Sequence, residues 1–266
     1  MSISLKTMIH IEQAVKDAGN GALFFFKSPD LQTKLKSKRD LVTEADERTE
    51  KMLLASLKKI HDIDFLSEEF NPETELTDKP AWIVDPIDGT TNFAAGIAPF
   101  AVSVAHYNGK TVDAAVCYLP VSDELFSAFH GNGAFLNGEK ISVNNDSSPI
   151  QCVAATGFAD ITHNEPVDTL KVFESVIKKV RTMRRLGSAV ADLVYTAAGK
   201  FAFFYEAGLS PWDVAAGSLI VKESGGVVTD FSGGKNYITG KTIIASNPAI
   251  YPFIKNEIDV YYSKKI

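Results

Sequence analysis

The 266-residue sequence predicts a fold of the α/β (α+β) class, with helices and β-sheets in layers. Apolar residues recur at helical spacing in the first third of the chain. In the middle, short apolar runs are joined by Asn-Gly pairs, which are typical of antiparallel hairpins. After Asn144, apolar strands alternate with helical patterns, which is typical of α/β proteins. We therefore expect an N-terminal α+β half, residues 1–145, and a C-terminal α/β half, residues 146–266, packed tightly as a single unit.

Two amphipathic helices are expected first. The first spans about residues 4–26, and its predicted buried face consists of Met8, Ile11, Val15, Ala18, Ala22 and Phe25. The second begins at Thr43, where Asp46 three residues later resembles a capping box. Its buried face is predicted to continue through Met52, Leu53, Leu57 and Ile60.

The middle of the N-terminal half is expected to be β-structure. The apolar run IDFL ends at the pair Glu68-Glu69, and WIVDPIDGTTNF (82–93) runs from an apolar strand into two aspartates. FAVSVAHY and KTVDAAVCYL flank Asn108-Gly109, a strong hairpin signal. Further short strands extend an antiparallel meander to about Val143.

The C-terminal half alternates between the two kinds of element. Strands are expected in residues 150–156, 182–186, 201–207 and 241–246, and helices in residues 165–180, 188–199, 213–224 and after Pro248.

The composition is that of an ordinary soluble protein, with 45% hydrophobic and 23% charged residues and a formal net charge of -6. This charge argues against nucleic acid or an anionic membrane as the main partner. No apolar run approaches the roughly 20 residues of a membrane span, and charged residues interrupt the first segment, so we expect neither a membrane anchor nor a signal peptide. Two isolated cysteines indicate a reducing cytoplasm, and five scattered histidines make a zinc site unexpected.

The carboxylates at the end of the 82–93 segment lack a nearby basic residue, because no lysine or arginine lies between Lys79 and Lys110. Asp85 and Asp88 flank a proline and are followed by Gly89, which together favour a rigid bend beyond the strand. Aspartates of this kind also form ordinary turns. The following Thr90-Thr91-Asn92 adds hydroxyl and N–H groups, as an anion site at a helix start requires.

The other acidic candidates each have a structural alternative as well. Glu68 fits a surface loop, Asp213 fits a helix N-cap, and Asp46 fits the capping box, whereas Glu206 closes an aromatic strand. Ends of strands and starts of helices are where α/β folds place their sites. If these carboxylates converge, protonation or cations must relieve their repulsion. Hard oxygen ligands favour Mg²⁺ or Mn²⁺, and paired ions of this kind are common in phosphate hydrolysis.

Five segments resemble signatures of the inositol monophosphatase family. They are DPIDGTTNF (85–93), PWDVAAGSLIVKESGGVVTD (211–230), KSKRDLVTEAD (36–46), the pair Glu68-Glu69 and RRLGSAVADL (184–193). They occur in the family's order over nearly the whole chain. Ser67 is a departure, since glycine is frequent before the glutamate pair.

The resemblance implies an αβαβα sandwich of the inositol monophosphatase and fructose-1,6-bisphosphatase type, acting as a single catalytic unit. It also implies a homodimer and two or more Mg²⁺ ions, with Mn²⁺ as an alternative. By this resemblance one ion is held by Glu68, Asp85 and the Ile87 carbonyl. The other is held by Asp85, Asp88 and Asp213.

The resemblance also assigns catalytic and substrate-binding roles. Thr90, paired with Asp46, would orient the attacking water, and Glu68 would take part in its activation. The N–H groups of Gly89 and Thr90 would bind the phosphate. The hydroxyl groups of the substrate would face Asp88, Glu206, Asp213 and the segment from Gly187 to Ala189. Lys36 and Asp40 would belong to a mobile loop that reaches the metal site.

The sequence therefore predicts Mg²⁺-dependent hydrolysis of a polyol or sugar phosphate monoester, foremost inositol 1-phosphate. Fructose 1,6-bisphosphate, a 3′(2′),5′-bisphosphate nucleotide and histidinol phosphate are alternatives within the same fold. An alternative of another class is a regulatory binding protein that keeps the fold and acts through a partner.

Overall fold

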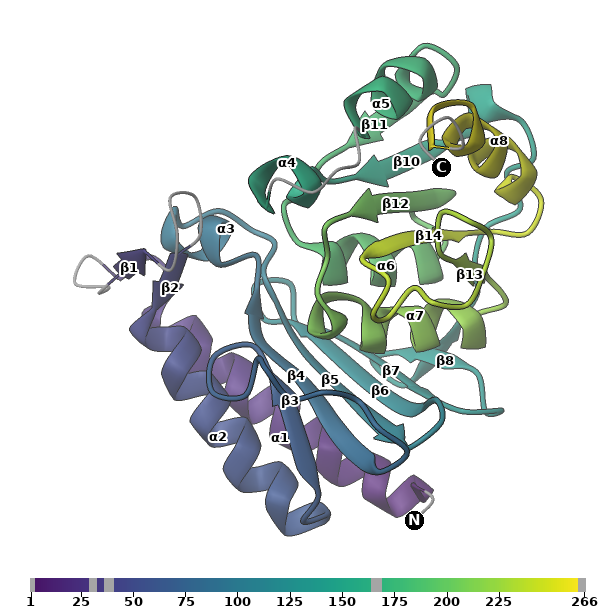
Figure 1. Cartoon of the computed structure of the whole chain (residues 1–266). Coiled ribbons are helices and arrows are strands. Elements are labelled where there is room, and N and C mark those ends of the chain that lie inside the picture. Colours follow the sequence, from purple (N-terminus) through teal and green to yellow (C-terminus); the bar gives the residue numbers. More distant parts are fainter. Residues whose placement is uncertain (1–2, 29–32, 36–40, 164–168, 263–266) are drawn as a thin grey trace.

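The computed structural model of the chain describes residues 3–28, 33–35, 41–163 and 169–262. Helices and sheets stack in five layers, in the order helix, sheet, helix, sheet, helix (Figure 1). The expected αβαβα arrangement is thus confirmed.

The first layer consists of α1 (Leu5–Phe25) and α2 (Glu44–Ile60), which cover one face of the larger sheet (Figure 1). Their inward faces contact the sheet through residues at helical spacing, Met8, Ile11, Val15, Ala18, Leu53 and Leu57. The capping box at the start of α2 is present as predicted. Met52 was wrongly expected in the core: its side chain is 43% exposed, because it lies beside the inward stripe set by Leu53 and Leu57.

The larger sheet has seven strands in sequence order. They are β3 (Asp64–Ser67), β4 (Pro80–Asp88), β5 (Ala101–Asn108), β6 (Val112–Leu119), β7 (Glu124–Phe129), β8 (Ala134–Leu136) and β9 (Glu139–Ile141). β3 and β4 pair in parallel, and every later neighbour pairs antiparallel. The hairpin predicted at Asn108-Gly109 joins β5 to β6.

Both faces of this sheet are covered, and so most positions of its central strands are apolar. In β6, Ala114, Val116 and Tyr118 pack toward α1 and α2, whereas Ala115 and Cys117 pack toward the middle layer. Successive side chains of a strand point to opposite faces, so a strand buried on both sides favours apolar residues on each face.

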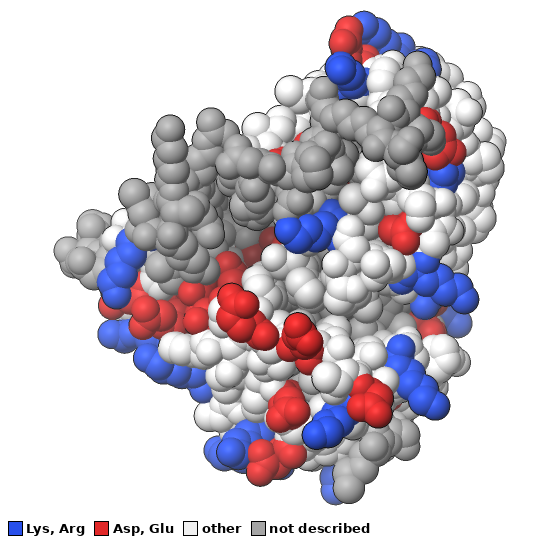
Figure 2. All heavy atoms as spheres, viewed as in Figure 1, with Lys and Arg blue, Asp and Glu red and all other residues white. Residues whose placement is uncertain are grey.

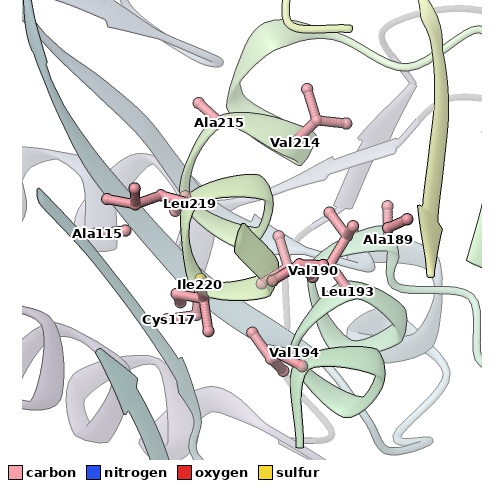
Figure 3. Packing of buried hydrophobic residues seen from close by; sticks show 14 of the residues in the cluster. Ala115, Cys117, Ala189, Val190, Leu193, Val194, Val214, Ala215, Leu219 and Ile220 are labelled. Carbon is pink, nitrogen blue, oxygen red and sulfur yellow. The ribbon is translucent and has the colours of Figure 1, made fainter. Parts of the chain in front are cut away.

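The middle layer consists of α6 (Ala189–Ala197) and α7 (Pro211–Glu223), which lie between the two sheets (Figure 1). Figure 3 shows side chains of both helices packed against Ala115 and Cys117 of the larger sheet. Since both helices are surrounded by protein, their sequences are apolar on almost every side.

The smaller sheet has five strands in the order β11-β10-β12-β14-β13. Their bounds are β10 (Val153–Thr156), β11 (Thr182–Arg184), β12 (Phe203–Ala207), β13 (Val227–Thr229) and β14 (Thr242–Ser246). β10 pairs in parallel with β11 and β12, whereas β14 pairs antiparallel with β12 and β13. The short strand β13 was not predicted.

The outer layer consists of α5 (Thr169–Ile177) and α8 (Tyr251–Tyr262), which pack on the far face of the smaller sheet (Figure 1). The remaining elements are short: β1 (Thr33–Leu35), β2 (Leu41–Thr43), α3 (Thr90–Ala94), a 3₁₀ turn (Pro149–Gln151) and α4 (Ala159–His163). Within the described ranges, no helix has the length and apolar character needed to cross a membrane.

Candidate active site

The end of β4 carries Asp85 and Asp88, and an irregularity in the strand turns both carboxylates the same way. Asp85 pairs with Ser103 of β5, and Asp88 pairs with Ala101, so three residues of β4 correspond to two of β5. In a regular strand, side chains three positions apart point to opposite faces. The extra residue cancels this alternation, as β-bulges near functional sites do.

Gly89 follows directly and brings a second segment of the chain to this point. It has a φ of +87°, and a Cβ there would lie 3.1 Å from the Gly187 carbonyl oxygen and 3.3 Å from the Ser188 Cβ. The Asn92 side-chain amide donates to the Leu186 carbonyl oxygen at 2.7 Å. The two segments that carry RRLGSA and DPIDGTTNF are therefore in direct contact.

Asp85, Asp88 and Asp213 form an acidic group, in which one carboxylate oxygen of each lies within 4.8 Å of the others. Asp85 and Asp88 are buried and Asp213 is half-buried. Asp213 also accepts a hydrogen bond from the Ser210 N–H at 2.7 Å through Oδ2, which completes the capping box of α7. The N-cap of α7 is Ser210 and not Asp213, because the helix begins at Pro211, two residues earlier than expected. Asp213 completes the capping box from the third helical position and belongs to the acidic group at once.

The electrostatics of this acidic group disfavour three negative charges. Burial raises the pKa of Asp85 well above its usual range, and the charges of Glu68, Asp88 and Asp213 raise this pKa further. Burial raises the pKa of Asp88 to about 6, although hydrogen bonds from Ser188 and Val190 oppose the shift. Burial and the charges of Asp88 and Glu68 likewise raise the pKa of Asp213 well above its usual range.

The acidic group fits a hard divalent cation. The Asp85 Oδ1 is buried and has no hydrogen-bond partner within the described ranges. Converging carboxylate oxygens are the ligands that Mg²⁺ and Mn²⁺ prefer. A bound cation would satisfy this oxygen and relieve the repulsion that raises the three pKa values.

Glu68 follows β3 and lies beside β4, where its N–H donates to the Val84 carbonyl oxygen at 3.2 Å. It is not one of the three residues within 4.8 Å, but its charge raises the pKa of Asp85.

Glu50 of α2 is buried and binds the residues on either side of Glu68. Its Oε1 accepts from the Ser67 hydroxyl at 2.6 Å and the Phe70 N–H at 2.9 Å, and its Oε2 accepts from the Glu69 N–H at 2.8 Å. The serine found where the family often has glycine therefore contributes a hydrogen bond. The sequence offered one signal for Glu50, a carboxylate close to the apolar stripe of α2.

Thr90 and Asp46 are hydrogen-bonded, as the resemblance implies. The Thr90 hydroxyl donates to Asp46 Oδ1 at 3.2 Å and also lies 3.0 Å from the Ile87 carbonyl oxygen. The other carboxylate oxygen of Asp46 accepts from the Thr43 N–H at 2.8 Å. The capping box of α2 thus holds Asp46 in place beneath Thr90.

A cavity of about 220 Å³ opens next to the acidic group. Its lining joins the start of α3, the start of α6 and the end of β12, and includes Asp88, Gly89, Thr90, Gly187, Ala189, Glu206 and Asp213. These are seven of the predicted site residues. Figure 2 shows acidic side chains gathered at the left of the face shown there, in the region where Figure 1 draws the start of α2 and the loop after β3.

Glu206 lies at the end of β12 and accepts from the Ala159 N–H at 3.0 Å. Burial raises the pKa of Glu206 to about 8, and the hydrogen bond from Ala159 opposes the shift. Gly157 touches this carboxylate so closely that a Cβ would lie 2.2 Å from its oxygens. Any other residue at position 157 would displace Glu206.

Asp192 lines the same cavity and was not singled out from the sequence. The one signal was a lone carboxylate within the apolar helix SAVADLVYTAA. Its contacts depend on how α6 packs between the sheets, which the local sequence does not specify.

Some expectations concern other parts of the chain. Lys36 and Asp40 lie outside the described residues.

The His61 and His106 rings are neighbours, with centroids 5.6 Å apart, although they are distant in sequence. Among the residues that the structure describes, however, the acidic group is the one set of three or more candidate metal ligands that converges.

Comparison with known proteins gives consistent matches along the chain. The model of the inositol monophosphatase family matches residues 5–259. A tomato (Solanum lycopersicum) protein named inositol monophosphatase 1 is 40% identical and covers 80% of each chain. The Escherichia coli K12 protein named Nus factor SuhB is 37% identical and covers 90% of each chain.

Solved structures agree with these relatives. The suhB protein of Bartonella henselae superimposes with a TM-score of 0.85 at 36% identity, covering 94% of this chain and 97% of that one. An IMPase of Thermotoga maritima superimposes with a TM-score of 0.83 at 32% identity, covering 95% and 96%. The chain belongs to the inositol monophosphatase family.

Proposed function

We propose that the protein is a Mg²⁺-dependent phosphatase that hydrolyses a phosphate monoester of a polyol or sugar, foremost inositol 1-phosphate. The observation that carries the proposal is the acidic group of Asp85, Asp88 and Asp213, with its unpartnered buried oxygen. Family membership and relatives named inositol monophosphatase support the same activity.

In this proposal the acidic group is the core of the metal site, and Glu68 and the carbonyl oxygen of Ile87 complete it. Bound Mg²⁺, or Mn²⁺ in its place, would supply Lewis acidity and a water of lowered pKa at neutral pH. The carboxylates of the acidic group and of Glu68 would supply the negative charge that makes the binding of the cation favourable.

Thr90 would orient the attacking water through its hydroxyl group. The hydroxyl lies 3.2 Å from Asp46 Oδ1 and 3.0 Å from the Ile87 carbonyl oxygen, and these two acceptors hold it in place. Glu68 would take part in accepting the proton of the water. The first N–H groups of a helix have no partner within it, and at α3 those near Gly89 and Thr90 would bind the phosphate oxygens.

The cavity beside the acidic group would hold the leaving alcohol. Asp88, Glu206 and Asp213 line it with the segment from Gly187 to Ala189. Glu206 is anchored through one oxygen by the Ala159 N–H. Hydrogen bonds from such fixed polar groups to the hydroxyl groups of a bound alcohol would set the orientation of its ring in the cavity.

Phosphate release from a substrate panel tests the proposal. The panel contains inositol 1-phosphate, fructose 1,6-bisphosphate, adenosine 3′,5′-bisphosphate and histidinol phosphate, each with Mg²⁺, with Mn²⁺ and with a chelator. We expect release that requires the metal and is fastest for inositol 1-phosphate. Release from none of them, by a folded and metal-bound protein, would contradict the proposal.

A second candidate is a regulatory role in which the protein binds a macromolecular partner. The relatives named Nus factor SuhB favour it. One chain could have both roles. The substrate panel favours the regulatory role alone only if no phosphate is released from any substrate. That nucleic acid is not a main partner stays a prediction from the net charge of -6.

We further propose that the protein is a homodimer, as the resemblance implies, and that it lies in the cytoplasm, as its two isolated cysteines indicate. Light scattering of the purified chain would test the oligomeric state, and a monomeric mass at working concentration would contradict it.

A further inference from the structure

Asp192 is a buried carboxylate in the wall of the cavity. It lies on α6, one helical turn after Ser188, and its N–H donates to the Ser188 carbonyl oxygen at 3.1 Å. The start of the same helix binds Asp88, through the Val190 N–H at 2.9 Å and the Ser188 hydroxyl. The position of Asp192 is therefore tied to the acidic group through a rigid element.

Asp192 differs from the other carboxylates of the cavity because one of its oxygens is buried without a hydrogen-bond partner in the described ranges. It is 1% exposed, and its Oδ1 has no hydrogen-bond partner there. Asp88, Glu206 and Asp213 each accept at least one backbone N–H. A buried polar group without a partner lowers the stability of the fold, so a residue with only a structural role would be disfavoured at this position.

Asp192 lines the cavity together with Gly187, Ala189 and Glu206, which are residues proposed to face the leaving alcohol. Burial raises the pKa of Asp192 well above its usual range, and the charges of Glu206 and Asp88 raise it further, while Arg185 opposes the shift.

We propose that Asp192 is a specificity-determining residue, whose carboxyl group forms a hydrogen bond with a hydroxyl group of the leaving alcohol beside Glu206. This inference rests on the proposed function and adds a contact that selects polyols. A hydroxyl group both donates and accepts, so it satisfies the carboxyl group whether or not the latter holds a proton. An alcohol without hydroxyl substituents would leave Asp192 unpaired and lose this contact.

The test compares Asp192→Ala and Asp192→Asn with the wild type on two kinds of substrate. The first kind is inositol 1-phosphate and fructose 1,6-bisphosphate, and the second is 4-nitrophenyl phosphate, whose leaving group has no hydroxyl substituent. For Asp192→Ala we expect kcat/KM on the better polyol or sugar phosphate to fall roughly 10- to 100-fold, mainly through KM. Its kcat/KM on the aryl phosphate should stay close to that of the wild type.

Asp192→Asn keeps an oxygen acceptor in the same shape and should recover most of the loss. Thr196→Val is the matched control, because Thr196 is buried one turn later on α6 and does not line the cavity. Thr196→Val should change kcat/KM on neither kind of substrate. Thermal unfolding of each variant confirms folding, and Asp192→Leu, which has a similar branched shape without an acceptor oxygen, gives the answer if Asp192→Ala does not fold.

For Asp192→Ala, equal losses on both kinds of substrate, or no loss on either, would overturn the role of Asp192. A wild type that hydrolyses the aryl phosphate but no polyol or sugar phosphate would also overturn it and leave the phosphatase chemistry standing. A wild type that hydrolyses none of them would overturn the proposed function and this inference with it.

Discussion

At the residue scale, the acidic side chains of this protein carry two kinds of interaction at once. Asp213 completes the capping box of α7 through one oxygen and meets Asp85 and Asp88 through its carboxylate. Asp46 completes the capping box of α2 and receives the Thr90 hydroxyl. A cap that is fixed by the backbone is a rigid way to aim a carboxylate. The structural interpretation of each aspartate therefore does not compete with the functional one.

Asp88→Asn tests the metal site at this scale. Asparagine with its oxygen in the place of Oδ2 keeps the bonds from Ser188 and Val190 and loses only the longer one from the Ala189 N–H at 3.3 Å, so the fold should be retained. Loss of the charge should weaken metal binding and lower turnover by about 100-fold or more. Phosphate release at saturating Mg²⁺ measures this, with Asp62→Asn, an exposed position, as the control. Turnover near that of the wild type would be incompatible with Asp88 as a metal ligand.

The same residues show what sequence reasoning can and cannot predict about a site. Asp85, Asp88 and Asp213 stand at element ends, where sequence alone marks them. Asp192 and Glu50 lie inside helices, and each meets a distant part of the chain: Glu50 binds Ser67, 17 positions away, and Asp192 lines the cavity with Glu206. Contacts of this kind depend on how layers pack, and so they became visible only in the structure.

At the element scale, α2 positions the loop after β3 through a single buried side chain. Glu50 accepts hydrogen bonds from the residues before and after Glu68. Burial raises the pKa of Glu50, and hydrogen bonds from Ser67, Glu69 and Phe70 oppose the shift. The loop therefore takes its shape from a helix rather than from its own sequence.

Glu50→Gln should loosen this loop. One carboxylate oxygen becomes an NH₂ group facing a donor, which costs about 1–3 kcal/mol. We expect the Mg²⁺ concentration for half-maximal activity to rise roughly 10-fold, with turnover largely restored at saturating Mg²⁺. Glu47→Gln, on the same helix with a half-exposed side chain, is the control. A lower melting temperature with an unchanged Mg²⁺ requirement would show that Glu50 has only a structural role.

Periodicity predicted most elements because it reports burial directly. It located α1, α2 and the β5–β6 hairpin, since each has a clear apolar stripe or turn. It placed Met52 wrongly, because a residue at the edge of a stripe is covered or exposed according to its neighbours. It missed β13, a strand of three residues that is defined by pairing with β14.

At the scale of the whole molecule, the site lies where the two sheets approach each other through the middle helices. The larger sheet supplies Asp85 and Asp88, α7 supplies Asp213, and the smaller sheet supplies Glu206. We propose that the chain divides near residue 145 into halves that act as a single catalytic unit. Neither half alone would contain the full set of acidic residues.

The convergence of these carboxylates should make stability depend on pH and metal together. Their pKa values are raised in the folded protein, to about 6 for Asp88 and about 8 for Glu206, from ordinary values of 3.8 and 4.5. At pH values between the ordinary pKa of these groups and their raised pKa, the folded state binds more protons than the unfolded state. The metal-free protein should therefore lose stability as pH rises from about 4 to about 8.

Metal binding should oppose this loss, because a cation binds the ionised carboxylates and displaces their protons. We expect the gain in melting temperature from Mg²⁺ over chelator to be small at pH 5 and several degrees at pH 8. Thermal unfolding at pH 5, 6.5 and 8 measures it. Asp85→Asn, which removes the carboxylate with the unpartnered oxygen, should abolish most of the gain while making the metal-free protein less sensitive to pH. A gain that is independent of pH, or that survives in this variant, would mean that the ion binds somewhere other than the acidic group.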